Sequence, residues 1–225
     1  MISQTLPRKL RRMSADCLGP EAPRSPGRFT RALGRLMLRA GGWRVEGGPL
    51  DRPRCVLVVA PHTSNWDFVH GLGAKWALGL SVRFLAKRAL FRFPLGAFLR
   101  AIGGIPVDRG ATEGLVGRIA AQFVPDGPLY LVVTPEGTRR RVPAWKTGFH
   151  RIAVAAGVPI LPVAVDYRER AVRLLPYYTP TGDYATDLRA LSAHFRPEMA
   201  RYPESYVVPA VDEGSGDRRE GTACE

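Results

Sequence analysis

The chain has 225 residues, of which 45% are hydrophobic, a size and composition that suit one α/β domain with a short appendage. Its 33 lysines and arginines against 20 aspartates and glutamates give a net charge of +13, which implies an anionic partner such as phosphate, phospholipid headgroups or nucleic acid. The three cysteines, Cys17, Cys55 and Cys224, are far apart, which excludes a CxxC metal or redox motif and fits a reducing compartment.

The N-terminal segment, residues 1–27, contains four prolines among scattered charges and shows neither helical nor strand periodicity. This composition predicts a disordered basic arm. The segment also lacks the apolar stretch of a secretory signal, so we do not expect export.

A helix is predicted next, over residues 28–42, because apolar and basic side chains repeat there at helical spacing. The two sets occupy different faces ahead of a Gly-Gly stop: Phe29, Leu33, Leu36, Met37 and Ala40 on one, and Arg28, Arg31, Arg35 and Arg39 on the other. We expect this amphipathic helix to lie on an anionic membrane surface. The alternative, a helix packed on the core, stays open.

Residues 43–211 form the predicted globular domain, in which short β-branched runs alternate with helical stretches. This alternation predicts an α/β fold with a largely parallel central sheet flanked by helices. The predicted strands are 55–60, 82–86, 105–108, 129–134 and 160–165, with an edge strand at 171–175, and the predicted helices are 67–80, 88–102, 112–123, 147–157 and 183–201. The longest apolar stretch, 152–165, is too short to span a bilayer, and a disordered tail is predicted over 212–225.

Three polar clusters follow predicted strands: PHTSNWD, DRG and PEGTRRR. In open α/β sheets, ligands bind at the carboxyl ends of the strands, so we expect the chemistry to lie in these clusters.

His62 and Asp67 in the first cluster are candidates for general-base chemistry. A turn between them would bring the Asp67 carboxylate to one imidazole nitrogen, fix the tautomer and leave the other nitrogen to accept a proton. Asp67 also suits a helix N-terminus, so a role as a cap stays open. Position alone does not decide between these roles.

The ordered set PHTSNWD, GGIPVDR, TPEGTRR and VPILPVAV resembles the four sequence blocks of the glycerolipid acyltransferase family, which includes bacterial 1-acyl-sn-glycerol-3-phosphate acyltransferases. The resemblance runs from about Val56 to Val165. It implies that His62 and Asp67 form a catalytic dyad, and that the fold is the family's α/β fold with the acyltransferase domain over 43–211.

The resemblance also implies a site for the acceptor phosphate. Its residues would be Arg109, Glu136, Gly137, Thr138 and Arg139, to which we add Lys146 as a further phosphate or CoA contact. Arg109 and Arg139 each carry a planar fork of donors suited to phosphate oxygens, although surface salt bridges are the alternative. The apolar fourth block, centred on Pro162, is expected to be structural or to line the acyl site.

The implied reaction is transfer of a fatty acyl group from acyl-CoA or acyl-carrier protein to a hydroxyl of a lysophospholipid. We expect 1-acylglycerol 3-phosphate to be the acceptor. Glycerol 3-phosphate or a lyso-aminolipid are alternatives, because Thr134, Arg140 and the Arg-rich insertion before WKTG depart from the common family pattern. We expect no metal and no cofactor beyond the acyl donor, because HExxH, phosphate-loop and dinucleotide motifs are absent from the sequence.

The expected location is the cytoplasmic face of the cell membrane, as a peripheral or monotopic protein. Two other classes of function remain: a basic nucleic-acid-binding protein, for which no binding motif is found, and a catalytically silent lipid-binding module.

Overall fold

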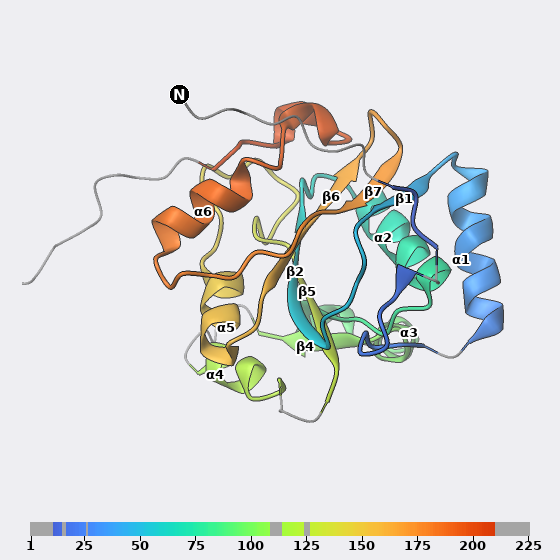
Figure 1. Ribbon diagram of the computed structural model, residues 1–225, viewed down its shortest axis with the longest axis horizontal. Helices are drawn as coiled ribbons and strands as arrows, with labels where there is room; N and C mark the ends of the chain where they lie inside the picture. Colours follow the sequence, from blue (N-terminus) through green and yellow to red (C-terminus); the bar gives the residue numbers. More distant parts are fainter. Residues whose placement is uncertain (1–10, 15–16, 26, 109–113, 124–126, 210–225) are drawn as a thin grey trace, which may run out of the picture.

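A seven-stranded sheet organises the protein in the computed structural model, which describes residues 11–14, 17–25, 27–108, 114–123 and 127–209 (Figure 1). The strands are β1 (Arg44–Gly47), β2 (Arg54–Ala60), β3 (Arg83–Lys87), β4 (Gly104–Val107), β5 (Leu129–Val133), β6 (Ile160–Asp166) and β7 (Ala171–Leu174). Their order is β1-β7-β6-β2-β5-β3-β4. All neighbours pair in parallel except β6 and β7, which form an antiparallel hairpin. The predicted largely parallel α/β fold is confirmed.

The helices cover both faces of this sheet. They are α1 (Arg28–Ala40), α2 (Asn65–Leu78), η2 (Arg88–Leu90), α3 (Leu95–Ala101), α4 (Leu115–Ala120), α5 (Gly148–Ala156), α6 (Tyr184–Ser192), η3 (Pro197–Met199) and η4 (Pro203–Ser205). In Figure 1, α1 and α2 lie to one side of β2, and α4, α5 and α6 lie to the other. Among the described residues, none of the helices is both long enough and apolar enough to cross a membrane.

The central strand β2 shows why two layers of helices are needed. Side chains on a strand alternate between faces, so Cys55 and Leu57 join the core beneath α1 and α2, whereas Val56 and Val58 join the core beneath α4, α5 and α6. All four are buried. A strand buried on both faces reads as a continuous apolar run, and this is the pattern that predicted it.

The N-terminal segment corrects the prediction of a disordered arm over 1–27. Met13, Leu18 and Ala22 are buried in the core with α1 and α2. Backbone hydrogen bonds tie this stretch to the domain, among them Met13 N–H to the Val45 carbonyl and Ser25 N–H to the Gly79 carbonyl. Isolated pairing along strand edges needs no periodic pattern, so the sequence carried no signal for it. Residues 1–10, 15–16 and 26 lie outside the described residues.

The predicted helix over 28–42 is present as α1, and its packing revises the expectation that its whole apolar face is free for a membrane. Leu38 is buried, and Gly34 lies so close to α2 that an added Cβ would meet the Ala77 nitrogen at 2.5 Å. Phe29 and Leu36 stay exposed, at 79% and 64%. The helix therefore uses one apolar edge for the core and leaves another at the surface.

Two helix boundaries and the position of one strand in the sheet also differ from the predictions. The helix expected over 88–102 is divided into η2 and α3 around Phe93-Pro94, because proline removes a backbone donor. The strand expected at the sheet edge, β7, is an inner strand, because the unpredicted β1 pairs outside it. The helix expected over 183–201 ends at Ser192, and η3 and η4 follow.

Candidate active site

The site is built where the parallel strands β2, β5 and β6 end. These three strands are adjacent and point the same way, so the loops that follow them meet at one edge of the sheet. The loop after β2 carries His62, the loop after β5 carries Glu136, and Tyr167 comes directly after β6. The expectation that the polar clusters after the strands lie at one edge is met for the described clusters.

His62 and Asp67 are brought together as the sequence predicted. His62 Nδ1 lies 3.1 Å from Asp67 Oδ2. A carboxylate only accepts, so Nδ1 carries the proton and Nε2 is left as the acceptor nitrogen. The Asp67 side chain is 2% exposed and the His62 side chain 17%, so the carboxylate is enclosed while the imidazole reaches the surface.

Asp67 also caps helix α2, so both roles considered for it are present. Its Oδ2 accepts from the backbone N–H groups of Thr63 at 2.9 Å and Ser64 at 2.8 Å, and the Ser64 hydroxyl accepts from Trp66 N–H at 3.2 Å. This reciprocal arrangement is a capping box. One carboxylate therefore fixes the start of the helix and the orientation of the imidazole.

Tyr167 completes the carboxylate's hydrogen bonds. Its hydroxyl donates to Asp67 Oδ1 at 2.7 Å. Burial, followed by the hydrogen bond to Asp67, raises the pKa of Tyr167 far above its usual value, so the phenol stays protonated and donates at neutral pH. Sequence reasoning missed this residue, although the rule that chemistry follows the strand ends applies to it directly.

Glu136 lies behind the histidine loop instead of on an open ligand surface. It is 4% exposed, and its Oε1 accepts from the backbone N–H of His62 at 3.0 Å. Burial raises its pKa to about 7, against the smaller lowering effect of its hydrogen bonds. Its Oε2 has no hydrogen-bond partner among the described residues. The position fits a support for His62 better than the direct acceptor contact expected from the sequence.

The other candidates of the third block gather in the loop that follows β5. Gly137 has a φ of +64°, and an added Cβ would meet Lys146 Cε at 3.0 Å, so the lysine stem lies against this turn. Lys146 N–H donates to the Pro135 carbonyl at 2.9 Å, and Thr138 Oγ1 accepts from Arg140 N–H at 3.3 Å. Arg139 and Lys146 are exposed at this edge, available to an anion.

The predictions for Arg109 and Pro162 have different outcomes. Arg109 lies outside the described residues. Pro162 is buried within β6, paired with Val58 of β2, which favours the structural role of the fourth block over a lining of the acyl site.

A second buried His–Asp contact lies away from this site, between His150 and Asp187. His150 Nε2 lies 2.7 Å from Asp187 Oδ2, and the two side chains are 5% and 0% exposed. His70 stacks on Trp43 with ring centroids 3.8 Å apart, and burial lowers its pKa. No local pattern indicated the His150–Asp187 pair, because its members are 37 positions apart.

Arg201 is a second site residue that sequence reasoning missed. Its guanidinium lies 5.7 to 5.8 Å from the ring centroids of Trp66, Tyr167 and Tyr202, within cation–π range. The neighbouring backbone N–H of Tyr202 donates to Thr63 Oγ1 at 3.3 Å. The C-terminal part of the domain therefore packs over the histidine loop.

A family model described as Acyltransferase matches residues 44–166, more than half of the chain. The chain belongs to this acyltransferase family. The match includes the histidine loop, the block after β5 and strand β6, whereas Tyr167 and Arg201 lie beyond it.

Curated relatives and one solved structure resemble this acyltransferase. The 1-acyl-sn-glycerol-3-phosphate acyltransferase of Salmonella typhimurium is 30% identical over 171 residues, covering 72% of this chain and 68% of the relative. The enzyme of the same name from Escherichia coli K12 is 28% identical over 172 residues with the same coverage. The crystal structure of the 1-acyl-sn-glycerophosphate acyltransferase of Thermotoga maritima aligns with a TM-score of 0.49 and 23% identity, over 69% of this chain and 70% of that one. The family match and the 30% identical relative show that the protein is an acyltransferase.

Proposed function

We propose that this acyltransferase transfers a fatty acyl group from acyl-CoA or acyl-carrier protein to the free hydroxyl of 1-acylglycerol 3-phosphate. The observation that carries the proposal is the His62–Asp67 pair, in which the enclosed carboxylate holds Nδ1 and the acceptor nitrogen Nε2 is on a partly exposed ring. The choice of acceptor is supported by the names of the curated relatives.

In the proposed reaction, His62 Nε2 takes the proton from the acceptor hydroxyl as its oxygen attacks the thioester carbonyl. Asp67 stabilises the imidazolium that forms, since its carboxylate already accepts from Nδ1. Collapse of the tetrahedral intermediate expels the donor's thiolate, which receives the proton from His62. The products are the acylated lipid and the free thiol, and the enzyme returns to its starting state.

The acyl group is proposed to pass directly between the substrates, because neither Cys55 on β2 nor Ser64 beside His62 fits an acyl-enzyme. The Cys55 thiol is fully buried, and burial raises its pKa well above its usual value. The Ser64 hydroxyl caps α2 as an acceptor from Trp66 N–H. Both substrates must then be bound together, and the kinetics should be sequential.

The acceptor phosphate is proposed to bind Arg139 and Lys146 at the exposed edge after β5, together with Arg109. Arginine offers two parallel donors to a phosphate, and lysine offers a point charge. Glu136 contributes by supporting the histidine loop from behind, through its contact with His62 N–H.

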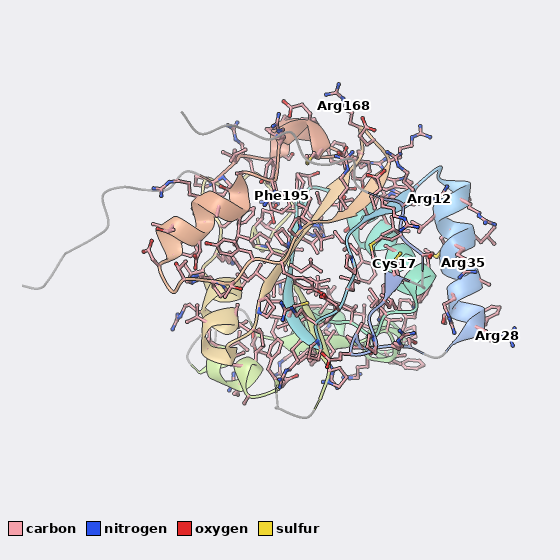
Figure 2. All side chains as sticks on the ribbon, in the orientation of Figure 1. Arg12, Cys17, Arg28, Arg35, Arg168 and Phe195 are labelled. Atoms are coloured by element: carbon pink, nitrogen blue, oxygen red, sulfur yellow. The ribbon has the colours of Figure 1, made fainter. Side chains whose placement is uncertain are left out.

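Attachment to an anionic membrane surface is also part of the proposal, as a peripheral contact at the cytoplasmic face. Helix α1 presents Phe29 and Leu36 on its free side, next to exposed Arg28, Arg35 and Arg39. Figure 2 shows Arg28 and Arg35 at the outer margin of the molecule. Apolar side chains beside arginines suit the boundary between acyl chains and anionic headgroups.

A panel of acceptors tests the proposed reaction. Purified protein is incubated with acyl-CoA or acyl-carrier protein and with 1-acylglycerol 3-phosphate, glycerol 3-phosphate or a lyso-aminolipid, with His62→Ala as the blank. Preferential acylation of 1-acylglycerol 3-phosphate supports the proposal. Turnover of another acceptor alone would reassign the substrate, and turnover by the blank at the wild-type rate would remove His62 from the mechanism.

A further inference from the structure

An apolar surface lies between the end of β3 and the end of α3, and the proposed reaction does not use it. Leu90, Phe93, Leu95 and Phe98 are exposed here, and Phe93 is 92% exposed. We call these four residues the β3–α3 surface. Burying an apolar side chain is favourable, so leaving several of them in water makes the folded chain less stable than it would be with them covered. Large apolar side chains exposed together on one short stretch of chain, residues 90–98, favour a site of interaction.

The surface has a firm base. Phe91, Leu99 and Ile102 point inward and form their own core cluster, against which Trp76 of α2 and Phe84 of β3 pack. Gly96 lies so close to the Phe91 backbone that an added Cβ would meet it at 2.3 Å, which holds the turn and α3 together. The outward side chains are therefore presented by a packed element.

The rim of the surface is basic. Arg88, Arg92 and Arg100 are all exposed, and Arg100 lies over the Phe91 ring at 5.5 Å. Among the described residues, the acidic partner recorded for these arginines is Asp108, 3.7 Å from Arg88. Apolar side chains surrounded by arginines complement an anionic bilayer, with its charged headgroups and apolar interior. A second copy of this positively charged chain would bring like charges together.

The surface also borders the active site. Strands β3, β5 and β2 are adjacent and parallel, so the end of β3 lies at the same edge of the sheet as the histidine loop. Phe68, two residues after Trp66 at the start of α2, lies 5.4 Å from Phe84 between ring centroids. Apolar contacts therefore extend from the first turn of α2 to the base of the β3–α3 surface.

We propose that the β3–α3 surface enters an anionic phospholipid bilayer, with its four apolar side chains at the acyl boundary and its arginines on the headgroups. The proposal deepens the proposed function, on which it rests for an acceptor delivered from a bilayer. It adds a docking element apart from α1, next to the dyad.

Flotation with vesicles of phosphatidylcholine and phosphatidylglycerol in a 3:1 ratio tests this proposal. Phe93→Ser/Phe98→Ser should weaken binding about tenfold or more, because two apolar side chains no longer enter the bilayer. Arg92→Gln/Arg100→Gln should weaken it about fivefold per arginine, and this loss should vanish on pure phosphatidylcholine. Val154→Ser is the matched control, since Val154 of α5 is an exposed apolar side chain elsewhere, and it should bind as the wild type does.

Unchanged binding by Phe93→Ser/Phe98→Ser overturns the proposal, as does a wild type that does not float. If Phe29→Ser/Leu36→Ser alone abolishes binding, α1 is the docking element instead. If the wild type is a dimer that Phe93→Ser/Phe98→Ser converts to a monomer without loss of flotation, the occupant is a second copy. Turnover of a short-chain, water-soluble 1-acylglycerol 3-phosphate by the variants separates failure of docking from failure of the proposed reaction.

A second inference rests on a different observation, the hydrogen bond from Tyr167 to the free oxygen of Asp67. Oδ2 of Asp67 is shared among His62 Nδ1 and the backbone N–H groups of Thr63 and Ser64, whereas Oδ1 accepts from Tyr167 at 2.7 Å. The other charged or titratable groups around the pair are Glu136, His70 and Arg201. Within the described part of the chain, the hydrogen bond to Asp67 Oδ1 comes from Tyr167.

We infer that Tyr167 is a positioning residue for the reaction, which holds the Asp67 carboxylate and draws off part of its negative charge. Without this donor, the carboxylate stabilises the imidazolium form of His62 more strongly. A general base must be neutral to act, so more of the enzyme would be inactive at low pH.

Tyr167→Phe removes only the hydroxyl and tests this inference. The kcat should fall about fivefold to tenfold with little change in KM, and the acid limb of the pH profile of kcat/KM should move to higher pH. Tyr178→Phe is the matched control, because Tyr178 donates to Asp187 Oδ1 at the same 2.7 Å, away from the site. An unchanged kcat and pH profile for Tyr167→Phe, with wild-type thermal unfolding, overturns the inference, as does an equal shift in Tyr178→Phe.

Discussion

Two His–Asp pairs in the described part of the chain have similar hydrogen bonds and different surroundings. His62 Nδ1 lies 3.1 Å from Asp67, and His150 Nε2 lies 2.7 Å from Asp187. In each pair, a tyrosine hydroxyl donates to the other carboxylate oxygen at 2.7 Å. The first pair is at the carboxyl end of β2, whereas the second joins α5 to α6 in the core.

Access, more than hydrogen bonding, separates the two pairs. The imidazole of the first is 17% exposed, and that of the second is 5% exposed. Burial alone would raise the pKa of Asp187, but hydrogen bonds from Tyr178, Thr181 and His150 outweigh it and lower the pKa to about 2. The same kind of His–Asp contact is therefore enclosed in the core in the second pair and accessible to a ligand in the first. A His–Asp contact identifies an active site only where a ligand can reach the imidazole.

The largest expected effect breaks the first pair. His62→Ala should lower kcat by about 10² to 10⁴, the usual contribution of a general base. The matched change His150→Gln should leave the kcat of the folded protein near the wild-type value. Initial rates at saturating donor and acceptor, normalised to folded protein, check both. A loss of kcat in His150→Gln comparable to that in His62→Ala would break the comparison.

Breaking the second pair should act on stability instead. Asp187→Ala leaves His150, Tyr178 and Thr181 without their shared acceptor in the core, so the free energy of unfolding should fall by about 3–5 kcal/mol. Denaturant unfolding measures this change. Asp67→Ala serves as the reference, and a larger loss there than in Asp187→Ala would show that the structural roles are reversed.

The pH dependence of stability should also differ between the two regions. The pKa of Glu136, behind His62, is raised to about 7, so the folded state binds this proton more tightly and its contribution to stability is lost as the pH rises from about 4.5 to 7. The pKa of Asp187 is lowered to about 2, so its contribution is present above pH 4 and lost as the pH falls through 2.

Glu136→Gln is neutral at every pH and should remove the first of these dependences, worth about 3 kcal/mol between pH 4.5 and 7. Denaturant unfolding at several pH values checks this difference. A wild type and a Glu136→Gln variant with parallel stability curves over this range would show that Glu136 titrates normally.

The smallest expected effect concerns the acceptor phosphate. Arg139→Ala should raise the acceptor KM about tenfold with little change in kcat, because a phosphate contact is made equally in the ground and transition states. Arg189→Ala on α6, an exposed arginine near the second pair, is the control. If the Arg139→Ala variant loses as much with an acceptor that lacks the phosphate, Arg139 does not read that group.

Local patterns predicted much of the fold and the first pair. The apolar run 55–60 identified β2, and the five-residue spacing between His62 in the following loop and Asp67 in the first turn of α2 allowed their contact to be expected. Contacts between distant segments left no such pattern. The short strand β1 and the packing of Met13 depend on pairing with remote strands, and Tyr167 reaches Asp67 across 100 positions.

The role of Glu136 shows a different limit. The family resemblance implied a ligand contact for Glu136, and only the burial of its carboxyl and its hydrogen bond from His62 N–H show that it faces the histidine loop. Sequence spacing places a residue at a sheet edge, whereas the direction of its side chain depends on packing.

Asp67 has both a structural and a positioning role, and this should affect which residues related sequences keep. Its carboxylate closes the capping box of α2 as well as orienting His62. Losing a helix-capping interaction costs about 0.5–2 kcal/mol, so a descendant without catalytic activity would still gain stability from an acidic residue at this N3 position. The His62 ring has no such structural role, since the capping box is formed by the side chains of Ser64 and Asp67. Among divergent descendants of this chain, retention of the histidine therefore indicates an active enzyme. Retention of the aspartate alone is compatible with an inactive protein that keeps the fold.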